Sequence, residues 1–260
     1  MLTALTRAVS RSLASCELTW LSRQEIDIDL AIEQHKQYER LLAALNIRVI
    51  SLPEQPDMPD SVFVEDPLVV VDEVAIVTRM GSPSRRAESE SLADAISAFR
   101  PIRRLVADQS RHPATLEGGD VMRIGRDVFV GLSSRTNAPG VQQLKRELEP
   151  FGYRVRSVEV RGCLHLKSAC CPMGDVRILA NTAWLDPTPL GDYTIVEVAP
   201  DEPGAANILR IGDAVIMPAS FPHTQEIVRG EGLDVRTVDI SELMKAEAAV
   251  TCSSVIFKAP

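Results

Sequence analysis

This sequence of 260 residues lacks long apolar runs, has no excess of positive charge, and has few cysteines, whose spacing does not suggest disulfide pairs. No apolar run approaches the roughly 20 residues that a membrane-spanning helix needs. The first 20 residues contain no uninterrupted apolar stretch, so we expect no secretory signal. The net charge of -8 argues against nucleic acid and anionic membranes as partners, and it suits a cationic substrate.

The cysteines are few, odd in number and without framework spacing: Cys16, Cys163, Cys170, Cys171 and Cys252. This pattern predicts free thiols in a reducing compartment, so the cytoplasm is the expected location. Three of the five lie near His165, but C-x-H-x₄-C-C is not a standard zinc spacing. We therefore expect no structural metal and no cofactor.

Self-similarity organises the rest of the chain. Pairs of β-rich runs joined by a polar turn recur at 61–80, 115–133, 163–181 and 205–220. Each pair is enriched in β-branched residues around glycine or aspartate, which is typical of a β-hairpin. The expected turns are Asp72-Glu73, Gly125-Arg126-Asp127, Gly174-Asp175 and Gly212-Asp213.

A helical pattern and a further strand follow most of these hairpins. The expected helix and strand pairs are 28–45 with 47–52, 85–99 with 102–106, 141–151 with 153–160, and 223–232 with 234–238. The third unit is irregular, because 181–192 carries two prolines and should be mostly loop before the strand 194–198. The C-terminal run 248–258 lacks a partner, and pairing it with the N-terminal segment 2–9 would close a ring of five units.

One conspicuous polar position is expected in the first strand of each unit. The positions, spaced 42 to 52 residues apart, are Glu65-Asp66, Glu117, His165, Asn207 and Cys252. Equivalent positions in a closed pseudosymmetric ring point at a common centre. A thiol, an imidazole and several carboxylates would meet there, which indicates a catalytic site.

Several motifs that carry these residues occur in order along the chain. They are DSVFVEDP (60–67), RMGSPSRRAE (79–88), TLEGGDV (115–121), SSRTN (133–137), LHLKS (164–168) and VTCSSV (250–255). Together they resemble the dimethylarginine dimethylaminohydrolase (dimethylargininase) family of the guanidine-modifying, or amidinotransferase, superfamily. The resemblance runs from RSLAS (11–15) to the end and implies a single catalytic domain, residues 1–260, of five ββαβ-type repeats. The implied fold class is α/β, a five-bladed pseudosymmetric propeller (pentein) with the active site at its central axis, which agrees with the repeats.

The resemblance also implies an activity and a catalytic triad. N-omega-methylated arginine, either asymmetric dimethylarginine or monomethylarginine, would be hydrolysed to citrulline and dimethylamine or methylamine. Cys252 would be the nucleophile that forms a covalent S-alkylthiouronium intermediate, His165 the general acid and base, and Glu117 the group that orients the imidazole. Gly118 and Gly119 would permit close backbone approach at the centre. The family further implies arginine metabolism and nitric oxide regulation, with a homodimer as a candidate assembly.

The substrate would be held at both ends. Glu65 and Asp66 match the guanidinium, because paired N–H donors fit carboxylates and a buried acidic pair needs a cation. Groups that resemble the site for the amino-acid end are Arg85 and Arg135 for the α-carboxylate, and Asp60 with the backbone of Leu18 and Ala246 for the α-amino group.

The dipeptide Glu247-Ala248 departs from the family, which often has Asp-Gly shortly before the nucleophile. Glu247 keeps a carboxylate for a guanidinium nitrogen but adds a methylene. Ala248 requires a backbone conformation that alanine tolerates. The many carboxylates around Cys252 should raise its pKa until a cationic substrate binds.

Two alternatives share the same residues. One is another guanidine-modifying reaction on this scaffold, either arginine deimination or amidino transfer. The other is a non-catalytic binding or zinc-responsive protein that uses the same pocket. The triad does not separate the first alternative, whereas the products of the reaction would. The presence of Cys252, His165 and Glu117 together argues against the second.

Overall fold

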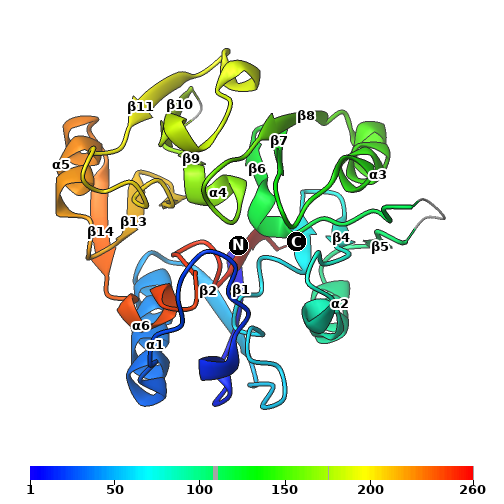
Figure 1. Ribbon diagram of the computed structural model, residues 1–260, viewed down its shortest axis with the longest axis horizontal. Helices are drawn as coiled ribbons and strands as arrows, with labels where there is room; N and C mark the ends of the chain where they lie inside the picture. Colours follow the sequence, from blue (N-terminus) through cyan, green and yellow to red (C-terminus); the bar gives the residue numbers. More distant parts are fainter. Residues whose placement is uncertain (108–110, 175, 260) are drawn as a thin grey trace.

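The computed structural model describes residues 1–107, 111–174 and 176–259. The strands in these described segments form five three-stranded sheets arranged around a common centre (Figure 1). In every sheet the middle strand pairs antiparallel with one neighbour and parallel with the other. The five-bladed α/β propeller expected from the repeats is therefore confirmed.

The blades follow the chain in order, apart from one that joins its two ends. The first comprises β3 (Leu68–Val70), β4 (Ala75–Val77) and β5 (Ile102–Arg104), and the second β6 (Val121–Ile124), β7 (Asp127–Leu132) and β8 (Arg154–Glu159). The third comprises β9 (Cys170–Pro172), β10 (Arg177–Ala180) and β11 (Thr194–Glu197), and the fourth β12 (Leu209–Ile211), β13 (Ala214–Pro218) and β14 (Asp234–Val238).

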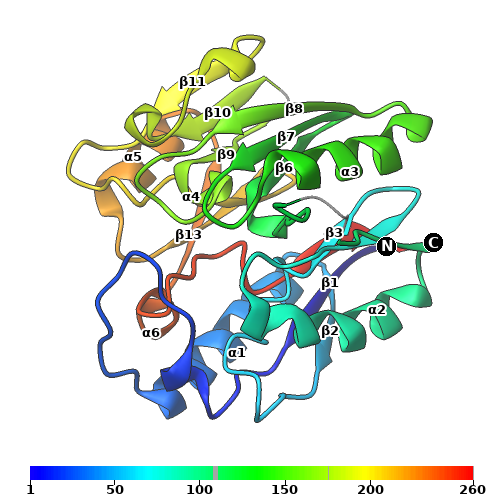
Figure 2. The ribbon, with the colours of Figure 1, turned by 45° about the vertical axis from the view of Figure 1, so that its right-hand side comes forward.

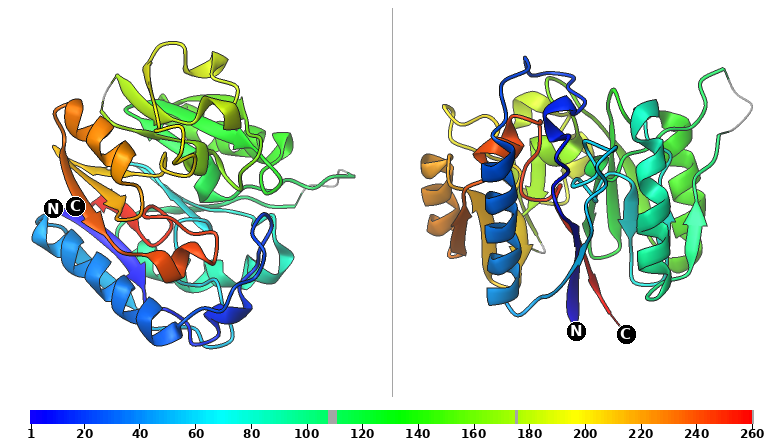
Figure 3. Two further views of the ribbon diagram at one scale, coloured as in Figure 1. Left: turned by 60° about the vertical axis from the view of Figure 1, so that its left-hand side comes forward. Right: turned by 90° about the horizontal axis from the view of Figure 1, so that it is seen from below.

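The fifth blade closes the ring. Its strands are β15 (Val255–Lys258), β1 (Leu2–Arg7) and β2 (Arg48–Leu52), in that order. Leu2 lies opposite Lys258 and Leu5 opposite Val255 in an antiparallel ladder, so the two ends of the chain lie side by side (Figure 3). The predicted pairing of the chain ends is confirmed.

Four helices lie at the periphery of the ring: α1 (Ile28–Ala44), α2 (Ser89–Ser97), α3 (Ala138–Leu148) and α5 (Pro222–Gly230) (Figures 1 and 2). Side chains at the N-caps explain where two of them begin, since Asp27 accepts a hydrogen bond from Leu30 N and Asn137 one from Gly140 N. The expected helix 85–99 is divided into a 3₁₀ helix, η2 (Pro83–Glu88), and α2.

The remaining helical segments are short. They are α4 (Leu166–Ala169), α6 (Ser241–Met244), η1 (Leu13–Ser15), η3 (Gly118–Asp120), η4 (Glu149–Phe151), η5 (Thr182–Trp184) and η6 (Thr188–Leu190). Both η5 and η6 fall in the segment expected to be mostly loop. No helix among the described residues has the length and apolar character needed to cross a membrane. Of the expected third turn, Asp175 lies outside the described residues.

Buried apolar residues form clusters between the sheets and the helices. One cluster joins Tyr38 and Leu42 of α1 to Ile216 of β13, and another joins Leu5 of β1 to Leu92 of α2. Burying one such side chain contributes about 1.5–3 kcal/mol to stability. These contacts fix neighbouring blades relative to one another and leave the hub to polar residues.

The structure corrects one expectation about those polar residues. They do not lie within the first strand of each unit but in the segment before it, since β3, β6, β9, β12 and β15 begin at Leu68, Val121, Cys170, Leu209 and Val255. The short segments η3 and α4 stand between Glu117 and β6 and between His165 and β9. Side chains in a strand alternate between its two faces, where they pack against neighbouring blades. A turn at the strand's start instead lets several chain segments converge at one end of the hub.

Candidate active site

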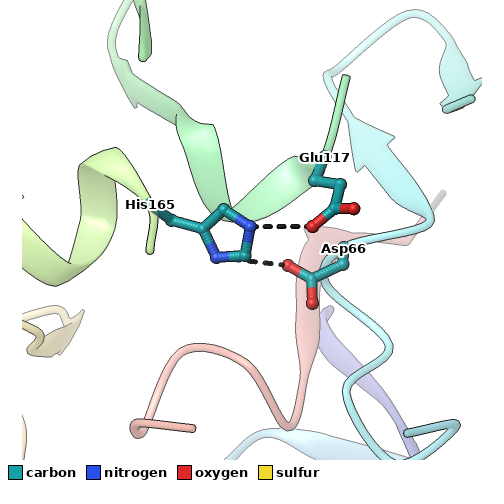
Figure 4. Close-up of side chains that lie close together, drawn as sticks. All are labelled: Asp66, Glu117 and His165. Atoms are coloured by element: carbon teal, nitrogen blue, oxygen red, sulfur yellow. Dashed lines mark hydrogen bonds and ion pairs between the residues drawn. The ribbon is translucent and has the colours of Figure 1, made fainter. Parts of the chain in front are cut away.

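A buried histidine and carboxylate form the centre of the site (Figure 4). His165 Nε2 lies 2.8 Å from Glu117 Oε2, and both side chains are buried. The other oxygen of Glu117 accepts hydrogen bonds from the backbone N–H groups of Gly81 and Ser82 at 3.0 and 3.3 Å. Because Nε2 is committed to Glu117, the imidazole presents Nδ1 for chemistry, 3.9 Å from Asp66 Oδ1.

The charges around this pair set its protonation. Burial by itself lowers the pKa of His165, but the carboxylates of Asp66, Asp120 and Glu117 outweigh burial and raise that pKa to about 9. Burial by itself raises the pKa of Glu117, but the hydrogen bond and charge of His165 lower it to about 2. The pair is therefore an imidazolium and a carboxylate at neutral pH.

Two glycines allow this close approach. A Cβ atom on Gly119 would lie 2.5 Å from His165 Nδ1 and 2.8 Å from Asp66 Oδ1, and a Cβ on Gly118 would lie 2.0 Å from the carbonyl oxygen of Glu65. Either contact is shorter than van der Waals distance allows. The expected close backbone approach at the centre is confirmed.

The groups expected to react share one small pocket of about 20 Å³, which holds about one water molecule. It is lined by Glu17, Asp60, Phe63, Asp66, Arg85, Arg135, Leu164, His165, Ala246, Glu247, Ala248 and Cys252. Eight of the eleven residues expected in the site are in this lining. Glu117 lies behind His165, while Leu18 is next to Glu17 in the loop over the pocket.

Cys252 is held in a tight turn that precedes β15. Its backbone N–H donates to the Ala249 carbonyl at 3.3 Å, and the Ala249 N–H lies 3.4 Å from Cys252 Sγ. The Glu65 N–H donates to the Cys252 carbonyl at 3.2 Å. These contacts fix the backbone on both sides of the sulfur and provide one N–H donor for a thiolate.

Asp66 is held by a buried arginine. Arg85 Nη1 donates to Asp66 Oδ2 at 2.8 Å, while its Nε and Nη2 donate to Glu88 at 3.0 to 3.3 Å. Burial and the neighbouring acids Asp60 and Asp66 raise the pKa of Glu88 to about 7, against the opposing effect of Arg85. Arg85, proposed for the substrate carboxylate, thus already balances buried acids.

Arg135 has more capacity than Arg85 to bind a ligand. Its Nη2 donates to Thr19 Oγ1 at 2.8 Å, and Nη1 lies 3.6 Å from Glu117 Oε1. Among the described residues Nη1 is buried without a hydrogen-bond partner. A buried donor in this state favours an incoming anion. Asp60, at the same end of the pocket, accepts the backbone N–H of Glu17 at 3.1 Å.

The adjacent acids Glu65 and Asp66 face different surroundings. Glu65 pairs with Lys167 Nζ and accepts a 2.8 Å hydrogen bond from Thr251 Oγ1. Together with Lys167 it lines a separate, larger cavity of about 420 Å³, whereas Asp66 lines the pocket of Cys252. The structure therefore places only Asp66 of this pair in the small pocket, with Glu65 behind it.

Glu247 contacts the loop over the pocket. Its carboxylate accepts hydrogen bonds of 2.5 to 3.0 Å from the backbone N–H groups of Thr19, Trp20 and Leu21. Its φ is +60°, so the left-handed conformation falls on Glu247 and not on Ala248. In this structure the Glu247 carboxylate is thus bound to the backbone of the loop that follows Glu17, a residue of the pocket lining.

The reactivity of Cys252 follows from its surroundings. Burial raises the pKa of the thiol, and the charges of Glu65 and Asp66 raise it further. We expect the resting protein to carry little thiolate at neutral pH. A cation bound beside Asp66 would offset these charges, so cationic amidine reagents should alkylate Cys252 disproportionately faster than neutral ones.

Ultraviolet thiolate absorbance, taken as the difference between the wild type and Cys252→Ser, measures the resting state directly. The substitution cancels the contribution of the other four cysteines, all of which are free and buried. A thiolate already fully formed below neutral pH would contradict this expectation and favour a preformed ion pair with His165.

One cluster at the site has the geometry to hold a metal ion. Ligand atoms of Asp66, Glu117 and His165 all lie within 4.8 Å of one another. The single nitrogen in this set is joined by oxygens that already bind Arg85, Arg135 and backbone N–H groups. A metal here would displace the contacts that orient the histidine, so we assign it no part in the reaction.

Sequence reasoning missed three charged residues that support the site. Glu88 orients Arg85, Lys167 pairs with Glu65, and Asp120 accepts the Leu166 N–H at 2.9 Å and raises the pKa of His165. All three lie inside motifs used for the family resemblance. Their position was therefore a signal, but their partners are set by the fold.

Comparison with known proteins identifies the family to which this chain belongs. A family profile described as N,N dimethylarginine dimethylhydrolase, eukaryotic, matches residues 15–173. A dimethylarginine dimethylaminohydrolase of Streptomyces coelicolor is 39% identical over 252 residues, which cover 97% of this chain and 95% of that protein. The chain belongs to the dimethylarginine dimethylaminohydrolase family. A second member, from Pseudomonas aeruginosa, is 36% identical over 231 residues, covering 89% and 90% of the two chains.

Solved structures of other proteins superpose closely on this chain. A cysteine-to-serine mutant of the Pseudomonas aeruginosa protein, complexed with citrulline, has a TM-score of 0.91 at 34% identity over 98% of both chains. The N-terminal domain of a cyanobacterial arginine dihydrolase has a TM-score of 0.89 at 18% identity, covering 100% of this chain and 99% of that one. The second likeness shows the shared fold alone.

Proposed function

We propose that this protein hydrolyses N-omega-methylated arginine to citrulline and dimethylamine or methylamine. The observation that carries the proposal is one pocket in which Cys252, Asp66 and the Glu117-bound His165 converge. Relatives that share 36 to 39% of their residues with this chain carry the name of that activity. A citrulline-bound structure of one relative supports the same product.

Cys252 is the proposed nucleophile and Asp66 the proposed guanidinium ligand. Asp66 would accept hydrogen bonds from the guanidinium and hold its central carbon beside the sulfur, with Glu65 adding negative charge from behind. Once the cationic substrate is bound, the Cys252 thiol loses its proton to solvent, and the resulting thiolate attacks that carbon to form a tetrahedral adduct. The C–N bond to the methylated nitrogen then breaks, and the amine leaves with a proton from His165 Nδ1.

The second half of the reaction uses the same imidazole in reverse. After the amine has left, the substrate carbon is bound to Cys252 as an S-alkylthiouronium. Neutral His165 takes a proton from water, whose oxygen attacks the carbon, and the C–S bond breaks. The thiol of Cys252 and the ureido group of citrulline are the products, and no redox partner is needed.

A product assay tests the function and its close alternatives. Arginine, monomethylarginine and asymmetric dimethylarginine are incubated separately with chelator-treated protein. We expect citrulline with dimethylamine or methylamine from the methylated substrates. Citrulline with ammonia from arginine would instead support a deiminase, and a new guanidino compound with ornithine would support an amidinotransferase. Absence of turnover, together with binding, would support a non-catalytic protein.

Arg135→Ala tests how the amino-acid end is held. Because Nη1 of Arg135 is buried and has no hydrogen-bond partner within the described part of the chain, loss of this side chain should raise KM for methylarginine on the order of 10- to 100-fold. An alkylguanidine without a carboxylate should be much less affected, and comparing the two substrates is the measurement. Equal losses for both would assign Arg135 a structural role.

Arg85 is proposed as a second clamp for the α-carboxylate, and Asp60, Leu18 and Ala246 are proposed for the α-amino group. Arg85→Ala is a less selective test, because it would also leave Asp66 and Glu88 buried without their cation. Glu247 is proposed to act at the substrate through the loop that it holds.

We further propose that the protein works in the cytoplasm, which its five free thiols support. No nucleic acid or membrane partner is proposed, in keeping with the net charge of -8. A homodimer and a part in nitric oxide regulation are proposals that the family suggests.

A further inference from the structure

Asn207 is a buried amide at the hub whose polar atoms are all used. It lies two residues before β12 and is 3% exposed. Its Oδ1 accepts the Thr251 N–H at 3.1 Å, while Nδ2 donates to Thr251 Oγ1 and to the Lys167 carbonyl, both at 3.0 Å. Asn207 is absent from the lining of the small pocket.

The partners of Asn207 belong to the two segments that carry the proposed chemistry. Thr251 directly precedes Cys252, and Lys167 lies in α4, which begins immediately after His165. One side chain therefore connects the nucleophile's turn to the helix that follows the general acid, across two blades. The separation between nucleophile and acid depends on how these segments are joined.

A second layer of contacts fixes the orientation of this connection. The hydroxyl of Thr251 accepts from Asn207 and donates to Glu65 Oε2 at 2.8 Å, and Glu65 also pairs with Lys167 Nζ. The hydrogen of that hydroxyl is thus already committed to Glu65. Only a donor at the Nδ2 position of residue 207 satisfies both acceptors that face it.

We propose that Asn207 is a positioning residue for the reaction, holding Cys252 in register with His165. This inference rests on the proposed function. Since Asn207 touches neither the pocket nor the groups expected to bind substrate, its loss should lower kcat and leave KM nearly unchanged. A shift of about 1 Å between reacting groups can cost about 100-fold in rate.

Two substitutions separate the connection from simple packing. Asn207→Asp keeps the shape but replaces the donating nitrogen with an oxygen that faces two acceptors, and Asn207→Ser shortens the side chain without adding charge. We expect each to lower kcat about 10- to 100-fold, with KM changed less than about threefold.

Asn181 provides the matched control. It is also buried, its Nδ2 donates to the Pro203 carbonyl at 3.0 Å, and its Oδ1 accepts the Ala183 N–H at 3.1 Å, but it is absent from the lining of the pocket. Asn181→Ser should lower the melting temperature and leave kcat at the wild-type level.

The experiment measures kcat, KM, melting temperature and the rate of Cys252 alkylation by a cationic amidine for all four proteins. Slower alkylation and lower kcat in both Asn207 variants, beyond any change in Asn181→Ser, would confirm the proposal. Wild-type kcat and alkylation in a folded Asn207→Ser or Asn207→Asp protein would overturn it, as would an equal rise in KM.

Citrulline turnover and the rate of Cys252 alkylation together distinguish failure of this inference from failure of the proposed function. If the wild type makes no citrulline from methylarginine, the function is wrong, and the alkylation rates still test the role of Asn207. If the wild type turns over and neither rate responds to Asn207, the function stands and the inference fails. Should both Asn207 variants fail to fold while Asn181→Ser folds, Asn207 is a folding residue and the proposal is overturned.

Discussion

Cys252→Ser should abolish turnover of methylarginine while leaving substrate binding nearly intact. Only a sulfur nucleophile is expected to attack a resonance-stabilised guanidinium here, because a serine hydroxyl is far less nucleophilic near neutral pH. Removing the nucleophile of a triad has cost on the order of 10⁶-fold in kcat elsewhere. Citrulline release is measured alongside substrate affinity, the latter by calorimetry.

Turnover should be lost while substrate binding is kept because of where the thiol lies. Cys252 lines a pocket whose proposed ligands for the substrate include Asp66 and Arg135. Oxygen in place of sulfur removes no charge from that set. Substantial turnover by Cys252→Ser would exclude a covalent cysteine intermediate, and a large loss of affinity would mean that the sulfur also positions substrate.

Cys163→Ser is a suitable control for this experiment. Cys163 is also buried and lies near His165, since its Sγ is 3.4 Å from the His165 carbonyl oxygen. Burial raises the pKa of this thiol to about 12, so it remains protonated. The control should keep kcat within a few-fold of the wild type, as expected for a small packing change.

The sequence was sufficient to predict the ring and its closure. Strand β14 spans the expected residues 234–238, and α1 ends one residue before the expected limit. These elements were predictable because local hydrophobic periodicity and turn residues determine them. The pairing of β1 with β15 was predictable because one hairpin partner was missing at each end.

The identities of the hub residues were also predictable, but several of their contacts were not. Glu65 and Asp66 are adjacent in a turn, and their carboxylates lie in different cavities. Sequence spacing contains no information about which of two neighbouring side chains points into a pocket. Likewise, Arg85 lies three residues before Glu88 in η2, and its ion pair depends on that 3₁₀ geometry.

Glu247, where the sequence departs from the family, is a second residue whose contacts could not be predicted from the sequence. The sequence gives a longer carboxylate where the family often has aspartate. Where that carboxylate goes depends on backbone N–H groups of Thr19 to Leu21, more than 200 residues away. Long-range contacts of this kind are settled by the closed ring, in which the two ends of the chain meet.

His165→Ala should reduce kcat by about 10²- to 10⁴-fold, the usual contribution of oriented acid–base catalysis. The imidazole both donates a proton to the leaving amine and takes one from water, so both halves of the reaction are affected. Single-turnover measurements should show slow formation of the covalent adduct and slow hydrolysis of it. A loss confined to one half would assign the other proton transfer to a different group.

The pH profile tests the same histidine without removing it. His165 must be protonated to release the amine, and its pKa is raised to about 9 in the folded protein. At saturating substrate, where the bound cation promotes the Cys252 thiolate, kcat should therefore fall as the pH rises above the pKa of His165. Glu117→Gln removes a charge that raises this pKa, so the alkaline limb should move to lower pH, and kcat should fall less than in His165→Ala.

The same pair links activity to stability, and the sign follows from the pKa shifts. The pKa of His165 is higher in the folded than in the unfolded protein, so its contribution to stability is complete below about 6.5 and is lost as the pH rises towards about 9. Glu117 has a lowered pKa, so its contribution is lost as the pH falls from about 4.5 towards about 2. Glu117→Gln should remove the acid limb of a plot of melting temperature against pH and weaken the alkaline limb, where Asp66 and Asp120 still raise the pKa of His165. An alkaline limb of kcat that stays in place in Glu117→Gln would show that Glu117 does not set the pKa of the proton donor, whatever happens to stability.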